Sequence, residues 1–191
     1  MSRLFPVAAL VVAVVAGQLV AGPGERAVAD QQDPRLDGLF ERLHDTQSDD
    51  EARSVEEQIW QVWLDSDDAN INQLMRQGVG AMHEQNYGTA LQIFDRMVEQ
   101  APNFAEGWNK RATLHYLMGD LSASVLDIQR TLALEPRHFG ALFGLGLIYD
   151  ALDQPKAALR SFEAALGLNP HSESARLRIE ELRQQLQGRP T

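Results

Sequence analysis

Apolar and small side chains recur along residues 71–172 with a period of 34 residues, marked by Pro102, Pro136 and Pro170. A period of this length is typical of stacked helical hairpins. Aligned on the prolines, columns 4 and 24 of each copy are bulky, and columns 8 and 20 are small. The bulky columns hold Leu74, Trp108, Leu142, Phe94, Ile128 and Phe162, and the small ones hold Gly78, Ala112, Gly146, Ala90, Ser124 and Ala158. The pattern predicts three repeats, 71–104, 105–138 and 139–172.

The columns have a simple physical meaning. Small residues let two antiparallel helices approach closely, and bulky residues fill the space on either side. Proline lacks an N–H and fixes φ, so it ends the second helix of each copy. One hairpin cannot bury its apolar face alone, whereas three stacked hairpins with caps can. We therefore expect an all-α solenoid.

Amphipathic segments flank the repeats on both sides. Residues 173–188 predict a capping helix, whose apolar stripe is Ala175, Ile179, Leu182 and Leu186. Residues 189–191 are expected to form a tail. Residues 30–70 predict a helical pair, whose stripes are Leu36, Leu39, Phe40 and Leu43, then Ala52, Val55, Ile59 and Trp63. Two interpretations of this pair stay open. It is a degenerate fourth repeat, splayed by His44 and Glu56 at small-residue columns, or an unrelated pair that caps the array.

The third copy matches a known signature, W-x2-L-G-x2-Y followed by A-x3-F-x2-A and P. Its matching residues are Leu142, Leu145, Gly146, Tyr149, Ala158, Phe162, Ala165 and Pro170. Here the chain resembles the tetratricopeptide repeat (TPR) family; the second copy departs at Arg111 and His115 and the first at Gln77 and Ala81. The resemblance implies a right-handed superhelix of antiparallel helix pairs. The whole chain also resembles small exported TPR proteins of Gram-negative bacteria.

The resemblance further implies a concave groove, lined by the first helix of each repeat, that binds a peptide or helix of another protein. The matching positions are Met75, Arg76, Val79, Met82, His83, Asn109, Lys110, Thr113, Tyr116, Leu117, Phe143, Leu147 and Asp150. Methionine and aromatic side chains offer adaptable apolar contact. Arg76, Lys110 and Asn109 offer donors for carboxylates or backbone carbonyls. The carboxylate clamp of some TPR proteins is absent, because Met75 and Val79 replace two of its polar residues.

In the third repeat, two positions of the expected groove have no side chain, because they are Gly140 and Gly144. Two interpretations stay open for them. They admit a bulky side chain or a helix, or together with Gly146 they only permit tight helix packing.

Residues 1–29 have the pattern of an export signal. Arg3 supplies the positive end, Val7–Val15 is unbroken apolar sequence, and Ala27-Val28-Ala29 precedes a predicted cleavage after Ala29. The alternative is an uncleaved membrane anchor, for which the apolar run is short. The chain has no cysteine, so disulfides are excluded. We expect an exported, periplasmic protein that does not insert in the membrane after cleavage.

Charge is unevenly distributed. Residues 30–70 hold thirteen acidic residues against three arginines, whereas residues 71–191 hold thirteen against twelve basic residues. The acidic flank is interpreted as a solvated face or as a docking surface for a basic partner. Nucleic-acid binding is disfavoured, because phosphates require a basic face.

No catalytic, cofactor or metal site is predicted. The five histidines never fall four residues apart on one helix, and no nucleophile or phosphate-loop motif occurs. We interpret His115 as a core or half-buried residue. We expect Trp108 to point inward, with Asn109 and Lys110 on the groove.

Three functional hypotheses follow. The first is a periplasmic scaffold or adaptor that binds a segment of an envelope protein in the groove. The alternative is a structural protein that self-associates into a homo-oligomer, such as a homodimer, through the acidic hairpin with Trp60 and Trp63 or through the C-terminal helix. The third, an enzyme, lacks any supporting constellation.

Overall fold

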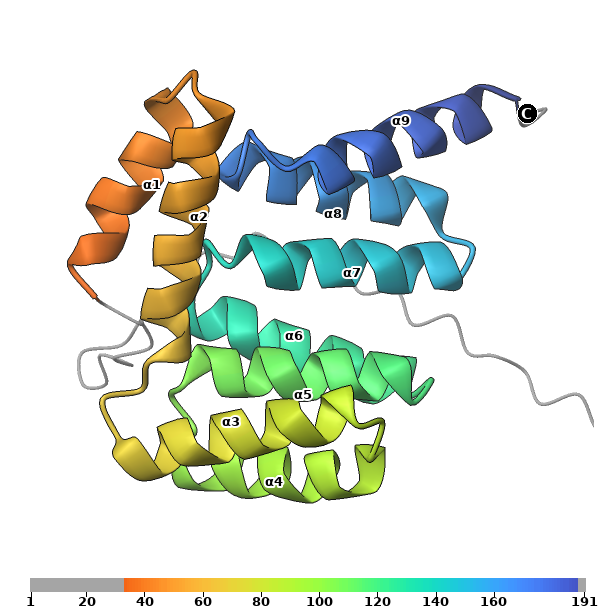
Figure 1. Ribbon diagram of the computed structural model, residues 1–191. Helices are drawn as coiled ribbons and strands as arrows, with labels where there is room; N and C mark the ends of the chain where they lie inside the picture. Colours follow the sequence, from red (N-terminus) through yellow and green to blue (C-terminus); the bar gives the residue numbers. More distant parts are fainter. Residues whose placement is uncertain (1–32, 189–191) are drawn as a thin grey trace, which may run out of the picture.

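The computed structural model describes residues 33–188, which are helical throughout with no strand in that range (Figure 1). The helices are α1 (Arg35–Asp45), α2 (Asp49–Leu64), α3 (Ala69–His83), α4 (Tyr87–Gln100), α5 (Ala105–Leu117), α6 (Leu121–Leu134), α7 (Phe139–Ala151), α8 (Pro155–Leu168) and α9 (Glu173–Gly188). The all-α prediction is confirmed. The predicted export signal lies outside the described residues, as does the tail. Between positions 33 and 188, no helix is long and apolar enough to cross a membrane.

The turn inside each repeat has one construction, used three times. In the first repeat, Gln85 adopts a left-handed φ of 58° and the Asn86 N–H donates to the Ala81 carbonyl at 2.9 Å. This bond pattern satisfies carbonyls at the end of the first helix. Asn86 then caps the second helix by accepting from the Thr89 N–H. The later repeats place Gly119 and Asp153 at the left-handed position, with φ of 80° and 54°.

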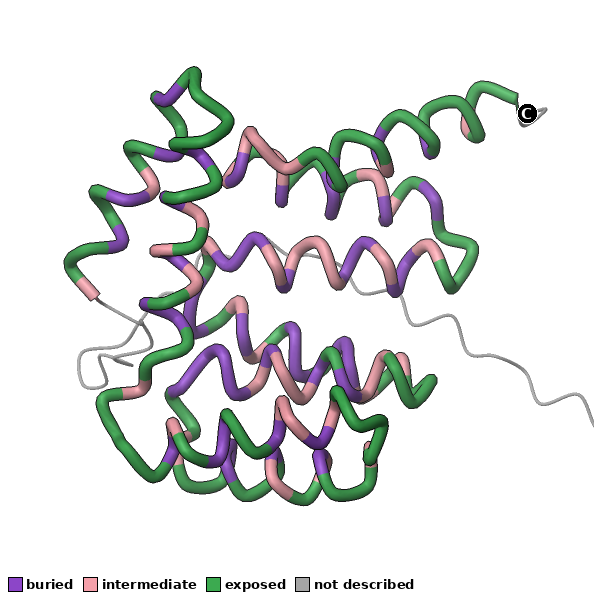
Figure 2. Tube along the Cα trace, in the orientation of Figure 1, coloured by how far each residue is buried: buried purple, intermediate pink, exposed green. Residues whose placement is uncertain are grey.

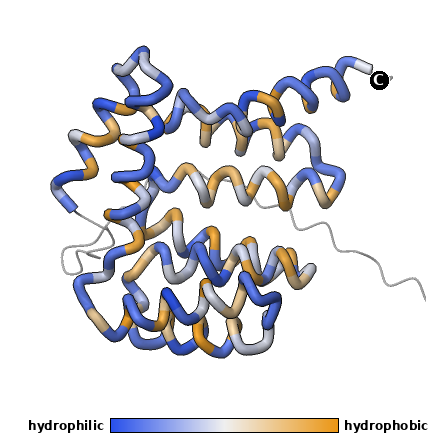
Figure 3. The backbone as a smooth tube through the Cα atoms, in the orientation of Figure 1, coloured by the Kyte–Doolittle hydropathy of each residue, from blue (hydrophilic) through white to orange (hydrophobic). Residues whose placement is uncertain are grey.

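The helices of each repeat pack closely because column 8 is small. A Cβ on Gly78 would lie 2.5 Å from a ring carbon of Phe94, and one on Gly146 would lie 2.5 Å from Phe162. Both phenylalanines are fully buried. Buried positions recur along each of the helices α3–α8 (Figure 2). Helix α7 is apolar along most of its length, whereas the outer surface of α9 is polar (Figure 3). Glycine–phenylalanine contacts therefore set the close approach of the two helices in the first and third repeats.

The second repeat replaces an apolar column with an ion-pair network. Arg111 donates to both carboxylate oxygens of Asp127 at 2.8 Å and to Asp95 at 2.8 Å, joining α5 to α6 and α4. Asp127 is buried, and His115 lies 3.8 Å from it, half-buried as interpreted. The Asp127 hydrogen bonds, with Asp95, raise the pKa of Arg111 above its ordinary value. Arg111 and His115, the two residues of this repeat that depart from the signature, thus both lie beside the buried Asp127 carboxylate.

The expectation that Trp108 points inward is wrong. Trp108 is half-buried but belongs to none of the apolar clusters of the described chain. The guanidinium groups of Arg111 and Arg130 lie 4.9 and 5.9 Å from its ring, and its indole N–H donates to the Pro102 carbonyl at 3.0 Å. Its neighbour Asn109 is buried instead. Two arginines, rather than apolar side chains, therefore cover the ring through cation–π contacts.

The N-terminal hairpin, α1–α2, does not continue the solenoid. It has its own core, in which Leu36, Leu43, Val55, Ile59 and Trp63 have no exposed surface. Figure 1 shows both helices running crosswise to α3–α8, beside the start of α7 and the end of α8. Phe139 of α7 belongs to the same apolar cluster. The hairpin therefore docks across the repeats rather than on α3 and α4.

Candidate functional site

The first helices of the repeats, α3, α5 and α7, are neighbours and form what we call the first-helix face. All thirteen predicted groove residues lie on these three helices. The face divides into two halves along the helix axes, because the N-terminal hairpin lies beside the starts of the helices (Figure 1). The two halves have different environments and are considered in turn.

Two tryptophans of α2 cover the N-terminal half where it is formed by α5 and α7. Trp60 approaches α7 so closely that a Cβ on Gly140 would lie 2.6 Å from its ring. Lys110 lies 5.5 Å from the centre of the same ring. Trp63 has no exposed surface and stacks on His138 with ring centres 4.2 Å apart. Gly140 therefore admits a bulky side chain, which comes from this chain's own helix, while Gly146 serves tight helix packing.

A buried polar cluster lies beneath the tryptophans. The Glu106 carboxylate, with no exposed surface, pairs with the Lys110 Nζ at 2.9 Å and accepts from the Asn109 Nδ2 at 2.9 Å. His138 accepts from the Ala141 N–H through Nδ1, so its Nε2 carries the proton and donates to Glu106 at 2.8 Å. Asn109 and Lys110 are therefore engaged within the chain.

The environment of Glu106 keeps it ionised. Burial raises the pKa of the Glu106 carboxyl, but the Lys110 charge and the hydrogen bond from His138 outweigh burial and hold that pKa below its ordinary value. Lys110 balances the charge of this buried carboxylate at Oε1, and the two hydrogen bonds from Asn109 and His138 both reach Oε2, so the group is a compensated structural charge. The cluster fixes the start of α5 against the start of α7.

Polar contacts also join the hairpin to the repeats. Arg137, at the junction of the second and third repeats, binds buried Glu135 at 3.1 Å and Asp37 of α1 at 2.6 Å. Asn169 donates to Glu56 of α2 at 3.0 Å. Part of the acidic flank thus meets polar and basic groups of its own chain. Sequence reasoning missed this; the signal was an acidic flank beside a nearly neutral solenoid.

The C-terminal half of the first-helix face remains uncovered. Arg76, His83, Thr113 and Leu117 are exposed, and Leu117 keeps 49% of its surface. The partly exposed residues of this half are Val79, Met82, Tyr116, Leu147 and Asp150, whereas Phe143 is partly exposed in the first half of α7. Asp150 is paired with Arg178 of α9, and Met75 is buried. The structure thus brings most predicted groove residues to the surface and withdraws Met75 and Asn109.

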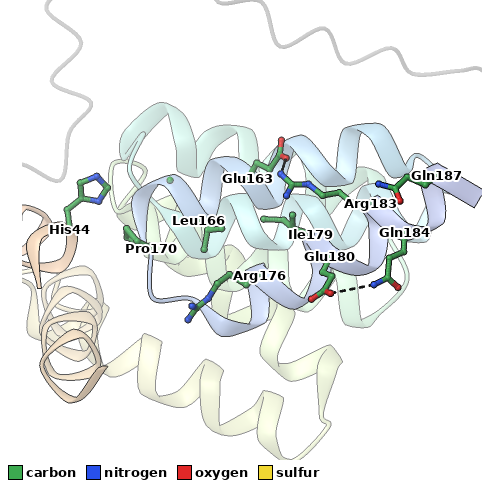
Figure 4. Close-up of a pocket in the computed structure, with 11 residues that line it drawn as sticks. His44, Glu163, Leu166, Pro170, Arg176, Ile179, Glu180, Arg183, Gln184 and Gln187 are labelled. Carbon is green, nitrogen blue, oxygen red and sulfur yellow. Dashed lines mark hydrogen bonds and ion pairs between the residues drawn. The ribbon is translucent and has the colours of Figure 1, made fainter. Parts of the chain in front are cut away.

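The surface has two hollows of note, of which the first borders the covered region. A cavity of about 190 Å³ is lined by Glu56, Trp60, Phe139, Gly140, Phe143, Ala165, Asn169, Ser172 and Ser174. A wider hollow of about 780 Å³ runs along α8 and α9, where Glu163 and Arg183 are paired at 2.7 Å (Figure 4). Within the described part of the chain, no three histidine or acidic side chains are grouped to hold a metal ion.

No family model matches the chain. Comparison with known proteins nevertheless finds relatives that contain TPR repeats. A TPR repeat-containing protein of Rhizobium etli is 35% identical over 167 residues, which cover 87% of this chain and 82% of that protein.

Solved structures agree with this relative. The Sgt2 TPR domain from Aspergillus fumigatus superposes with a TM-score of 0.60 at 18% identity, covering 65% of this chain and 87% of that one. The first TPR of Spaghetti (RPAP3), bound to the HSP90 peptide SRMEEVD, superposes with a TM-score of 0.59 at 19% identity, covering 62% and 94%. At these identities the likeness is one of fold, and it confirms the predicted all-α superhelix.

Proposed function

Since the chain belongs to the tetratricopeptide repeat family, we propose that it is a non-catalytic scaffold that binds a segment of another protein on the C-terminal half of its first-helix face. The observation that carries the proposal is the division of this face by the α1–α2 hairpin. Trp60 and Trp63 fill the N-terminal half at α5 and α7, whereas apolar side chains of all three helices stay accessible in the C-terminal half.

The accessible surface indicates the chemistry of the partner. Val79, Met82, Tyr116, Leu117 and Leu147 offer flexible aliphatic and aromatic contact. Such residues suit an apolar or amphipathic segment, either extended or helical.

One charge accompanies these apolar contacts. Among residues 33–188, the exposed Arg76 guanidinium has no carboxylate partner, so it is available to a carboxylate or carbonyl of the bound segment. The solved relative with an HSP90 peptide shows that a TPR protein of this fold can hold a peptide.

We place the mature protein in the periplasm and its partner in the cell envelope. Support comes from the signal-like residues 1–29, from the absence of cysteine in the sequence and from the bacterial relative. Self-association through the tryptophans is less well supported, because Trp63 is fully buried and Trp60 is packed against Gly140 in a single chain.

The test is affinity capture from periplasmic extract, read by mass spectrometry. The bait is the exported protein, compared with a Tyr116→Ala/Leu147→Ala variant of the uncovered half. Leu126→Ala on α6 is the matched control, because Leu126 is 66% exposed and lies outside the first-helix face. A protein captured by the parent and the control but lost by the double variant supports the proposal. Equal capture by all three refutes the site, and light scattering of the bait reports any homo-oligomer.

A further inference from the structure

Acidic side chains that lose solvent in this protein are paired with a basic side chain, with one exception. Within residues 33–188, six acidic residues are buried or partly buried, and five of them form ion pairs: Asp33, Glu106, Asp127, Glu135 and Asp150. The sixth, Glu56 of α2, has no basic nitrogen within 4 Å in that range. The exception is informative because a partly desolvated charge is costly unless a counter-charge is near.

The two partners of Glu56 are neutral. The indole N–H of Trp60 donates to one carboxylate oxygen at 3.3 Å, and the Asn169 amide donates to the other at 3.0 Å. A carboxylate has about four acceptor positions, so roughly two remain for further donors. Both bonds fix the carboxylate between α2 and the end of α8, and leave its charge uncompensated.

Glu56 lines the cavity of about 190 Å³ between the hairpin and the third repeat. Trp60, Phe139 and Phe143 supply aromatic walls, and Ala165 adds an aliphatic one. Pockets that hold drug-sized molecules begin near about 300 Å³, so this cavity matches a single long side chain. Aromatic walls beside one carboxylate favour a cation with an apolar stem, since aromatic faces attract cations and methylene groups.

We propose that this cavity binds a lysine or arginine side chain of the partner protein, with its charged end at Glu56. The proposal rests on the proposed function and adds to it the chemistry of one anchor residue. The aliphatic stem lies along Phe143 and Ala165, and the cation completes the acceptor positions of Glu56. The surplus of acidic residues in the N-terminal flank attracts such a basic partner over a longer range.

The cavity is tested with small probes that need no knowledge of the partner. The full exported chain is titrated with Nα-acetyl-lysine methylamide, with the corresponding arginine derivative and with the neutral norleucine derivative. The Trp60 indole N–H signal in ¹⁵N-resolved NMR reports binding and is assigned by Trp60→Phe. Glu56→Gln removes the charge and keeps the side-chain shape, and Glu57→Gln, at an exposed neighbouring position, removes an equal charge outside the cavity.

The basic probes are expected to shift the Trp60 signal in a saturable way, and norleucine is not. Because a charge-assisted hydrogen bond is lost, Glu56→Gln is expected to weaken binding about tenfold, while Glu57→Gln matches the parent. Equal shifts with norleucine, equal affinity in Glu56→Gln, or no saturable shift would each overturn the inference. Partner capture by the Tyr116→Ala/Leu147→Ala variant is measured in a separate experiment. A cavity that binds no basic probe can therefore be distinguished from an uncovered half that binds no partner.

Discussion

Alanine at Gly140 provides a sharp test of the docked hairpin. The added Cβ would lie 2.6 Å from a ring carbon of Trp60, well inside van der Waals contact, so the indole or α7 must move. Gly144, one turn later on α7, is the matched control, because a Cβ there would meet only Ile128 at 3.7 Å. Both changes replace glycine by a better helix former.

The expected effects have opposite signs. Gly144→Ala should stabilise by about 0.5–1 kcal/mol, since alanine restricts the unfolded chain and favours the helix. Gly140→Ala adds an overpacking cost of about 1–3 kcal/mol against Trp60. The free energies of unfolding of the two variants should therefore differ by roughly 1–3 kcal/mol, with Gly140→Ala the less stable.

Urea unfolding followed by far-UV circular dichroism measures both free energies, and tryptophan fluorescence reports the surroundings of Trp60. A red-shifted emission is expected for Gly140→Ala only, because the displaced indole meets more water. Equal stability of the two variants, with unchanged emission, would show that Trp60 does not pack on Gly140 in solution. The division of the first-helix face would then be refuted.

Three further predictions follow from named contacts. Arg111→Leu, which restores the TPR signature, should lower the free energy of unfolding by about 3–5 kcal/mol, because buried Asp127 loses its counter-charge. The double variant Arg111→Leu/Asp127→Leu should recover most of this loss in urea unfolding. Additive losses in the two single variants and the double variant would refute the coupling. The folded-state pKa of Glu106 lies below its ordinary 4.5, so its contribution to stability is present above about pH 4.5 and is lost as the pH falls through the folded pKa. Glu106→Gln should therefore flatten the acid limb of the stability–pH curve, and an unchanged limb would contradict the assignment. N-terminal sequencing of the exported protein should start at Asp30, and an intact residue 1 would support the anchor instead.

The repeats were predictable from sequence because their packing is local and periodic. Columns 8 and 24 meet inside one hairpin, as Gly78 and Phe94 do. The same two columns recur with the same spacing in each copy, so the contact is recognisable in the sequence. The groove positions on the first helices came from the resemblance to the TPR family. Solvent exposure of Arg76 and burial of Met75 lie beyond this pattern, since both depend on neighbouring helices.

The docked hairpin was not predictable, because its contacts are not periodic. Trp60 and Gly140 are far apart in the chain, and only the fold shows that one fills the space left by the other. Lys110 and Glu106 are one helical turn apart, so the sequence shows that they can pair. It does not show that this pair lies beneath Trp60. Long-range contacts of this kind decide which part of the face is available to a partner.

In the proposed function, a partner binds the C-terminal half of the first-helix face while the hairpin stays in place. Hydrogen–deuterium exchange of the exported protein, free and with its captured partner, tests it most directly. We expect slower exchange in the second halves of α3, α5 and α7, with exchange in α2 unchanged or slower. Faster exchange in α2, together with protection at the starts of α5 and α7, would show that the partner displaces the hairpin and would contradict the account.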